Sequence, residues 1–423
     1  MMEIKQFTEH PKVYNLLLDL KNEGVHEKQF SDVLDEEGNQ YVELVMEGGG
    51  VLGVALIGYN YVLEQMGLRF FSLAGTSAGS INSLLLAGMG DVSQPKAEKL
   101  VDVLANKDLM EFVDGDKDVV DVVEAIVEKA KIMKLMWKGW QVIDNIRDDL
   151  GLNPGNDFLE WLTEILNEKQ VYTTKDLEER FGLVPDGLKI RENVDRDITG
   201  LKPRFAVIAS ELTTGTKVEF PRMRALYWDD IDKVNPAIFV RASMSVPYFF
   251  HPLVLKDLPQ GAKAIENWRT LAKFKGDPPA EAYFVDGGLM SNFPIDVFHN
   301  KSSVPRMPTF GVRLGSDRDS TNKITNAFNL FGAMFNSIRF LHDYDFILKN
   351  PDYNSLVQNI DIGDHDWLNF GIGAEAKIDL FVRGAEAAAK FVRRFNWQKY
   401  KNVRQIVKNQ QMEIDTAKGK GEI

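Results

Sequence analysis

The sequence predicts an α/β protein with a central, mainly parallel sheet, a helical insertion and a helical C-terminal region. Between residues 41 and 87 a strand, a glycine-rich turn and a helix follow one another twice. Residues 91–200 show helical patterns and no convincing strand, and helical patterns dominate again after residue 321. Alternating strands and helices build parallel sheets with helices on their faces. The two helical stretches are therefore expected to be additions to such a sheet.

Length and composition narrow the class of protein. The chain has 423 residues, 44% of them hydrophobic, and a net charge of −12, which argues against nucleic acid as a partner. The absence of cysteine excludes disulfides, zinc–thiolate sites and cysteine nucleophiles. The first residues lack the apolar core of a secretory signal, and no run approaches the ~18 apolar residues of a membrane span. We expect a cytoplasmic protein, with peripheral contact to a membrane as the alternative.

The first half of the chain divides into a leader, a sheet segment and an insertion. Residues 1–40 are a polar leader with one helix near Val13 to Leu20, and residues 41–320 are the expected catalytic domain, with the insertion at about 91–200. Four elements open this domain: strands Tyr41–Met46 and Phe70–Ala74, and helices Val54–Met66 and Ala78–Ala87. In the insertion we expect helices through Asn167, capped by Asn156 or Asp157, and after Thr174.

One stripe of the insertion has two interpretations. Apolar side chains recur there at helical spacing, with lysines opposite: Met133, Met136, Trp137 and Trp140 against Lys131, Lys134 and Lys138. Such a stripe faces a protein core or lies in a membrane interface. The core-facing interpretation is favoured.

The second half returns to strands and then to helices. The expected strands are 204–210, 217–220, 283–285 and 309–314, with a helix from Pro236 to Met244. A C-terminal helical region over 321–395 follows, with helices at about 322–348 and 374–395. Residues 396–423 are polar and lysine-rich, which predicts a frayed tail.

Two glycine-framed turns carry the candidate chemistry. Gly75-Thr76-Ser77-Ala78-Gly79 follows a strand and precedes a helix, the arrangement of a nucleophile elbow, although a tight turn with an incidental serine has the same pattern. The loop Gly48–Gly53 also matches a dinucleotide-binding pattern. That fold needs an acidic residue at the end of the next strand, and the chain has none there. The loop therefore fits an oxyanion hole better.

Asp286 is the candidate base. It ends the strand Tyr283–Val285 and precedes two glycines. We expect its carboxylate at the carboxyl edge of the sheet, in a place equivalent to that of Ser77, where ligands of α/β sheets bind. Burial there would raise its pKa and make it a better proton acceptor. A surface Asp-Gly-Gly turn is the alternative interpretation.

Together the three turns resemble the patatin-like phospholipase family in order and spacing. Further similar stretches are Ala209–Gly215, Ala242–Phe250 and Leu289–Pro294, so the resemblance covers about residues 41–314. It implies the patatin-like three-layer fold and a Ser77–Asp286 dyad without metal or cofactor. The oxyanion would be held by the N–H groups of Gly48, Gly49 and Gly50. The family often carries Arg or Lys where this chain has Leu52, which leaves the headgroup preference open.

The expected function is hydrolysis of fatty acyl esters, as a phospholipase A or lysophospholipase acting on phospholipids or other acyl lipids. A lipid acyltransferase on the same site and a catalytically silent lipid-binding protein are the alternatives. A Ser-His-Asp triad is the rival mechanism, because His299, His342 and His365 follow Asp286 in the order of α/β-hydrolases. His251 fits a structural role better.

Overall fold

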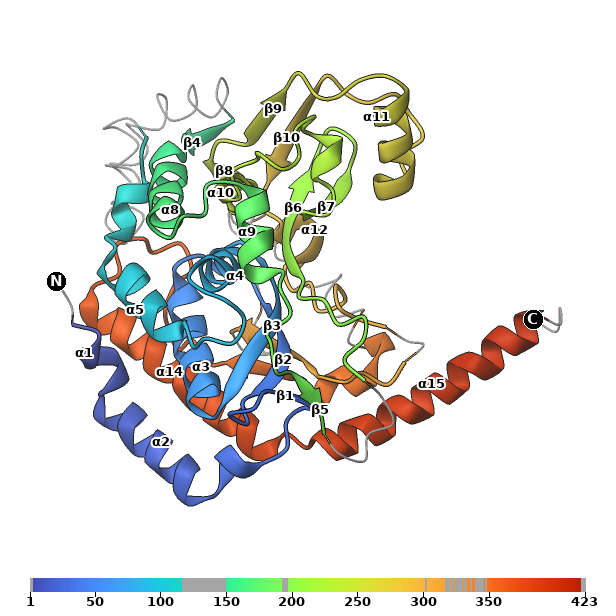
Figure 1. Cartoon of the computed structure of the whole chain (residues 1–423). Helices are drawn as coiled ribbons and strands as arrows, with labels where there is room; N and C mark the ends of the chain where they lie inside the picture. Colours follow the sequence, from blue (N-terminus) through green and yellow to red (C-terminus); the bar gives the residue numbers. More distant parts are fainter. Residues whose placement is uncertain are drawn as a thin grey trace.

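The computed structural model (Figure 1) describes most of the chain. The described residues are 3–115, 150–191, 197–300, 303–315 and 348–419, together with 321, 324, 330, 333–334, 337–338 and 346. The amphipathic stripe around Trp137, His342 and most of the helix expected over 322–348 lie outside these residues.

The core of the molecule is one mixed sheet with the order β12-β11-β2-β3-β6-β10-β9. The strands from β12 to β6 are parallel, whereas β10 and β9 run antiparallel, as does β7 beside β6. Their bounds are β2 Gln40–Met46, β3 Leu68–Thr76, β6 Phe205–Glu211, β7 Thr216–Phe220, β9 Leu253–Lys256, β10 Glu281–Val285, β11 Thr309–Leu314 and β12 Val357–Ile360. The short strands β1 (Val33–Leu34) and β5 (Lys189–Ile190) extend this sheet beside β2. The mainly parallel sheet is confirmed.

Helices cover the central strands, and one of them is buried all round. α3 (Gly53–Gln65) follows the glycine loop, and its residues from Gly53 to Glu64 are all buried. The reason is α14 (Ala374–Arg394), which packs along α3 (Figure 1) and also contacts the sheet at β12 and at Phe310 of β11. The contact is close: a Cβ on Gly58 would overlap the backbone of Phe381, and one on Gly384 would overlap that of Ala55. The C-terminal helical region is thus part of the main body.

The leader and the end of the chain pack on this body as well. α1 (Lys5–Thr8) and α2 (Pro11–Asn22) contact α14. Where a frayed tail is predicted from residue 396, the structure has α15 (Trp397–Gly419). Its first turns are held because Asp32 accepts hydrogen bonds from Trp397 and Lys401, and Arg404 pairs with Asp352 in the interior. Figure 1 shows the second half of α15 extending away from the body.

The described part of the insertion is helical, with two short strands that its composition does not predict. Its elements are α5 (Ala97–Asn106), a 3₁₀ turn Leu109–Phe112, β4 (Gly151–Asn153), α8 (Asn156–Glu168) and α9 (Thr174–Phe181), followed by β5. β4 pairs with β8 (Tyr248–Phe250), so the insertion is joined to the strand that precedes β9. Two predicted caps are wrong: α8 has Gly155 at its N-cap without a side-chain bond, and α9 is capped by Thr173.

The remaining described elements are short: α10 (Ala237–Ser243), α11 (Ala262–Asn267), the π-turn Trp268–Ala272, α12 (Gly288–Ser291) and 3₁₀ turns at Val25–Glu27, Gly50–Leu52, Arg224–Leu226 and Pro351–Ser355. None of the helices in the described part of the chain combines the length and apolar character that crossing a membrane requires.

Candidate active site

Ser77 lies in a strained turn between β3 and α4 (Ala78–Gly88). Its backbone has φ 50° and ψ −120°, a conformation that a non-glycine residue adopts at a cost of about 1–3 kcal/mol. The flanking glycines are required by space: a Cβ on Gly75 would overlap the backbone of Gly79, and one on Gly79 would overlap that of Met46. The strand–turn–helix context expected for a nucleophile elbow is therefore present.

Two buried hydroxyls hold this turn. The Oγ of Ser243, at the end of α10, accepts a hydrogen bond from the Ser77 N–H at 2.9 Å. The same hydroxyl donates to the carbonyl of Ile208 on β6 at 2.6 Å. Ser80, one turn into α4, donates to the Ser77 carbonyl at 2.6 Å. The elbow is thus tied to a neighbouring strand and to its own helix.

Asp286 reaches the elbow from the direction opposite to the one expected. β7 pairs with β6 along one edge, so β3 and β10 share the other edge, paired with the first and second halves of β6. The two strands run toward each other, since β3 is parallel to β6 and β10 is antiparallel. Thr76 pairs with Ile208 and Val285 with Ser210, so the next residue of each strand, Ser77 or Asp286, arrives at the level of Ala209. The predicted equivalence of two parallel strand ends is wrong.

The turn after β10 packs tightly on the elbow. Gly287 donates its N–H to the carbonyl of Ser243 at 3.0 Å, so Ser243 bonds both turns. A Cβ on Gly287 would lie 2.9 Å from Cγ2 of Thr76 and would overlap the carbonyl of Ile208. Asp286 is 3% exposed, and its Oδ1 accepts a hydrogen bond from the Gly288 N–H at 2.7 Å. The carboxylate is thereby oriented within a buried turn beside Ser77.

The N–H groups of the three consecutive glycines between β2 and α3 differ in their hydrogen bonding. Gly48 donates its N–H to the carbonyl of Asn292 at 3.1 Å. For the N–H groups of Gly49 and Gly50, the described residues provide no acceptor. Of the three glycines predicted to form the oxyanion hole, Gly48 is therefore already bonded, while Gly49 and Gly50 have N–H groups ready to donate.

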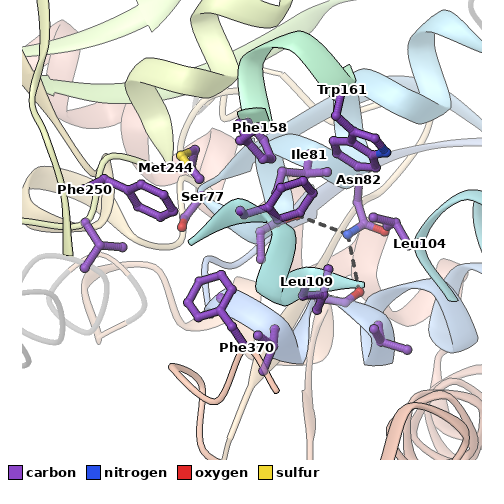
Figure 2. Close-up of a pocket in the computed structure, with 17 residues that line it drawn as sticks. Ser77, Ile81, Asn82, Leu104, Leu109, Phe158, Trp161, Met244, Phe250 and Phe370 are labelled. Atoms are coloured by element: carbon purple, nitrogen blue, oxygen red, sulfur yellow. Dashed lines mark hydrogen bonds between the residues drawn. The ribbon is translucent and has the colours of Figure 1, made fainter. Parts of the chain in front are cut away.

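A pocket opens on Ser77 and the glycine loop (Figure 2). Its walls are almost entirely apolar: Val51, Val54, Ile81, Leu104, Leu109, Phe112, Phe158, Trp161, Met244, Val246, Phe250 and Phe370. Figure 2 shows Ser77 near Met244 and Phe250, with Trp161 and Leu104 toward the other side of the pocket. The polar side chains on its wall are Ser77 and Asn82, whose amide donates to the carbonyl of Ala78. Such walls suit a hydrocarbon chain.

A buried arginine joins the loop before α8 to residues on either side of β8. Arg241, 3% exposed, donates to the carbonyls of Pro154, Gly155 and His251. Burial lowers its pKa to about 10. It also bonds the hydroxyl of Ser245, whose carbonyl accepts the Asp286 N–H at 2.7 Å. In the sequence the stretch Ala242–Phe250 is notable only for its family likeness, because the roles of Arg241 and Ser243 depend on tertiary contacts.

The histidines in the described part of the chain make their contacts away from the pocket. None of them lines the pocket. The ring of His299 bonds the hydroxyl of Tyr353 at 2.7 Å, and that of His365 bonds Asp379 at 2.9 Å. Among the described residues no group of three His, Asp or Glu side chains is arranged to hold a metal ion.

The fold and the pocket define an α/β protein with an apolar site at a strand–turn–helix elbow. Residues 44–299 match the family described as patatin-like phospholipase. The chain belongs to this family, whose members are in general lipid acyl hydrolases.

Individual proteins are similar to the chain as well. The uncharacterized protein YqhO of Bacillus subtilis is 29% identical over 359 residues, which cover 84% of this chain and all of that protein. The structure of VipD from Legionella pneumophila is similar over 86% of this chain and 70% of VipD, with 15% identity and a TM-score of 0.41. The second likeness is too distant to support an argument about the site.

Proposed function

We propose that the chain hydrolyses fatty acyl esters of phospholipids or lysophospholipids with a Ser77–Asp286 dyad. The observation that carries the proposal is the meeting of β3 and β10 on one edge of β6, where the buried aspartate follows one strand and the strained serine, which lines an apolar pocket, follows the other. Membership in the patatin-like family supports a lipid acyl substrate.

In the first half of the reaction Oγ of Ser77 attacks the acyl carbonyl while its proton passes to the Asp286 carboxylate. The carbonyl oxygen becomes an oxyanion, which the N–H groups of Gly49 and Gly50 stabilise. Gly48 joins them only if its bond to Asn292 is exchanged. The C–O bond to the leaving alcohol then breaks, Asp286 returns the proton to that alcohol, and an acyl ester of Ser77 remains.

In the second half a water molecule attacks this ester, giving its proton to Asp286. The fatty acid leaves and the proton returns to Ser77. If another alcohol replaces water, the same acyl-enzyme makes the protein an acyltransferase. If the dyad is silent, the pocket would only bind lipid. Leu52 is buried on the glycine loop, so a headgroup finds no cation at that position.

Release of fatty acid from mixed phospholipid vesicles tests the dyad. Ser77→Ala and Asp286→Ala are each expected to lower the rate by about 10³-fold or more, because each removes a reacting group. The matched controls are Ser83→Ala and Asp296→Ala. Ser83 lies on the helix that follows the elbow, and Asp296 is an exposed residue ten positions after Asp286. Wild-type rates in both dyad variants would show that the site is wrong.

The histidines separate the dyad from a triad. Alanine at His251, His299 or His365 is expected to leave hydrolysis within about tenfold of wild type, since none lines the pocket. Circular dichroism of each variant checks the fold. A thousandfold loss at one histidine in a folded protein would favour a triad instead.

A further inference from the structure

A C-terminal segment outside the family match lies on the proposed oxyanion loop. Residues 361–373, here called the strap, connect β12 to α14, and the family match ends at residue 299. The strap has no regular secondary structure beyond turns. It nevertheless contacts both the glycine loop and the pocket.

The first contact is between backbones. The carbonyl of Trp367 accepts a hydrogen bond from the Val51 N–H at 3.1 Å. This bond fixes the peptide plane between Gly50 and Val51. The backbone angles of Gly50, with φ +54°, then determine how the preceding peptide and its N–H are directed. A Cβ on Gly50 would overlap the Trp367 carbonyl, so the approach requires glycine.

The second contact is at the pocket. Phe370 lines the pocket together with Gly50, Val51 and Ser77. Its ring stacks on that of Phe249, with centroids 4.8 Å apart and planes at 11°. In Figure 2 the ring lies below Ser77, on the wall next to the elbow. The strap thus supplies an aromatic wall close to the proposed nucleophile.

The strap is fastened to α14. His365 and Arg383 both bond one oxygen of Asp379, at 2.9 and 2.6 Å, and Arg383 also donates to the carbonyl of Asp361 at 3.3 Å. α14 in turn lies directly on α3, where Gly58 and Gly384 allow the backbones to meet. Because α3 starts immediately after the glycine loop, the C-terminal region contacts both the loop itself, at Gly50 and Val51, and the helix that follows it.

We infer that the strap is a positioning and specificity element of the proposed acyl hydrolase. The Trp367 carbonyl orders the loop whose Gly49 and Gly50 N–H groups receive the oxyanion, and Phe370 forms a wall for the acyl chain. The inference rests on the proposed function. It extends the catalytic unit beyond residue 320, where the sequence places its boundary.

Two variants separate these effects. Asp379→Ala removes the fastening of the strap without touching the pocket. Its matched control is Glu23→Ala, which removes an exposed ion pair between α2's C-terminal end and Arg393 at the other end of α14. Phe370→Ala removes the wall, and Phe370→Leu restores an apolar side chain. The full-length protein is assayed with p-nitrophenyl esters of four and sixteen carbons and with a fluorophosphonate that labels activated serines.

Asp379→Ala is expected to lower kcat and the rate of labelling by about tenfold for both chain lengths, since a loosened loop stabilises the oxyanion less well. Glu23→Ala should keep the wild-type kcat and labelling rate, although its Tm should change about as much as that of Asp379→Ala. Phe370→Ala is expected to change the ratio of kcat/KM between the two esters by about tenfold, and Phe370→Leu to restore most of it.

The outcomes distinguish this inference from the proposed function. Activity that survives Ser77→Ala would refute the proposed function and the strap's role with it. If Ser77→Ala is inactive while Asp379→Ala and Phe370→Ala keep the wild-type kcat and chain-length ratio, the function stands and the strap inference is refuted. A loss in Asp379→Ala that only follows its folded fraction would refute the positioning role.

Discussion

Replacing Ser243 by alanine removes one hydroxyl that bonds two buried backbone groups. Ser243 is fully buried, and its Oγ accepts from the Ser77 N–H and donates to the Ile208 carbonyl. The change to alanine leaves its backbone free to bond Gly287 as before. The variant therefore tests the elbow's support while leaving every proposed reacting group in the chain.

The expected magnitude follows from the two lost partners. A buried group left without its hydrogen bond costs about 1–3 kcal/mol, so the free energy of unfolding should fall by about 2–6 kcal/mol, toward the lower end if the elbow relaxes. Relaxation would release the strain at φ 50° of Ser77. It would also move the nucleophile, so kcat should fall by about tenfold to a hundredfold.

Urea unfolding and fatty acid release from vesicles measure the two effects. Ser83→Ala is the matched control, because the buried Ser83 hydroxyl has no hydrogen-bond partner within the described part of the chain. Its removal should be nearly neutral or stabilising. If Ser243→Ala unfolds and turns over like Ser83→Ala, the hydroxyl does not hold the elbow and the reasoning is refuted.

Two further predictions concern stability. Burial raises the pKa of Glu43 on β2 from 4.5 to about 7, despite a hydrogen bond from Thr309. The folded state therefore holds the carboxyl proton of Glu43 more tightly than the unfolded state does. As the pH rises from about 4.5 to 7, the free energy of unfolding should fall by at most about 3 kcal/mol. In Glu43→Gln, urea titrations across this range should lose that part of the pH dependence, and an unchanged slope would contradict it. Gly384→Ala places a Cβ against the Ala55 backbone and should cost about 1–3 kcal/mol or more by the same assay, whereas Gly373→Ala, with no heavy atom within 4 Å, should not; equal effects would show that the helix contact is adaptable.

Local patterns in the sequence were enough for the elements around the elbow. Strands β2 and β3 are mostly apolar in sequence because both of their faces are buried. Gly75 and Gly79 mark the turn because backbone approaches exclude a Cβ at both positions. Such requirements are local, so the residue types reveal them. The serine that occupies the turn is therefore visible in the sequence alone.

Contacts between distant segments were not visible in this way. Tyr283 to Val285 predicts a strand, but nothing within it says that β10 runs against β6, since strand direction depends on how the chain between β7 and β10 returns to the sheet. The polar sequence of α15 does not indicate that the helix is held to the body, because the partners of Lys401 and Arg404, Asp32 and Asp352, lie far away in the sequence.

The sequence by itself thus determined the α/β class, the strained serine turn, the glycine loop and the Asp286 turn, because each is written in neighbouring residues. Only the tertiary structure decided how they meet. The head-on approach of β3 and β10, the hydrogen bond from Ser77 to the Ser243 hydroxyl and the strap on the glycine loop all join residues more than a hundred positions apart. The physical reason for these contacts is packing: two backbones approach closely where a glycine leaves room or where a buried hydroxyl bonds the backbone groups.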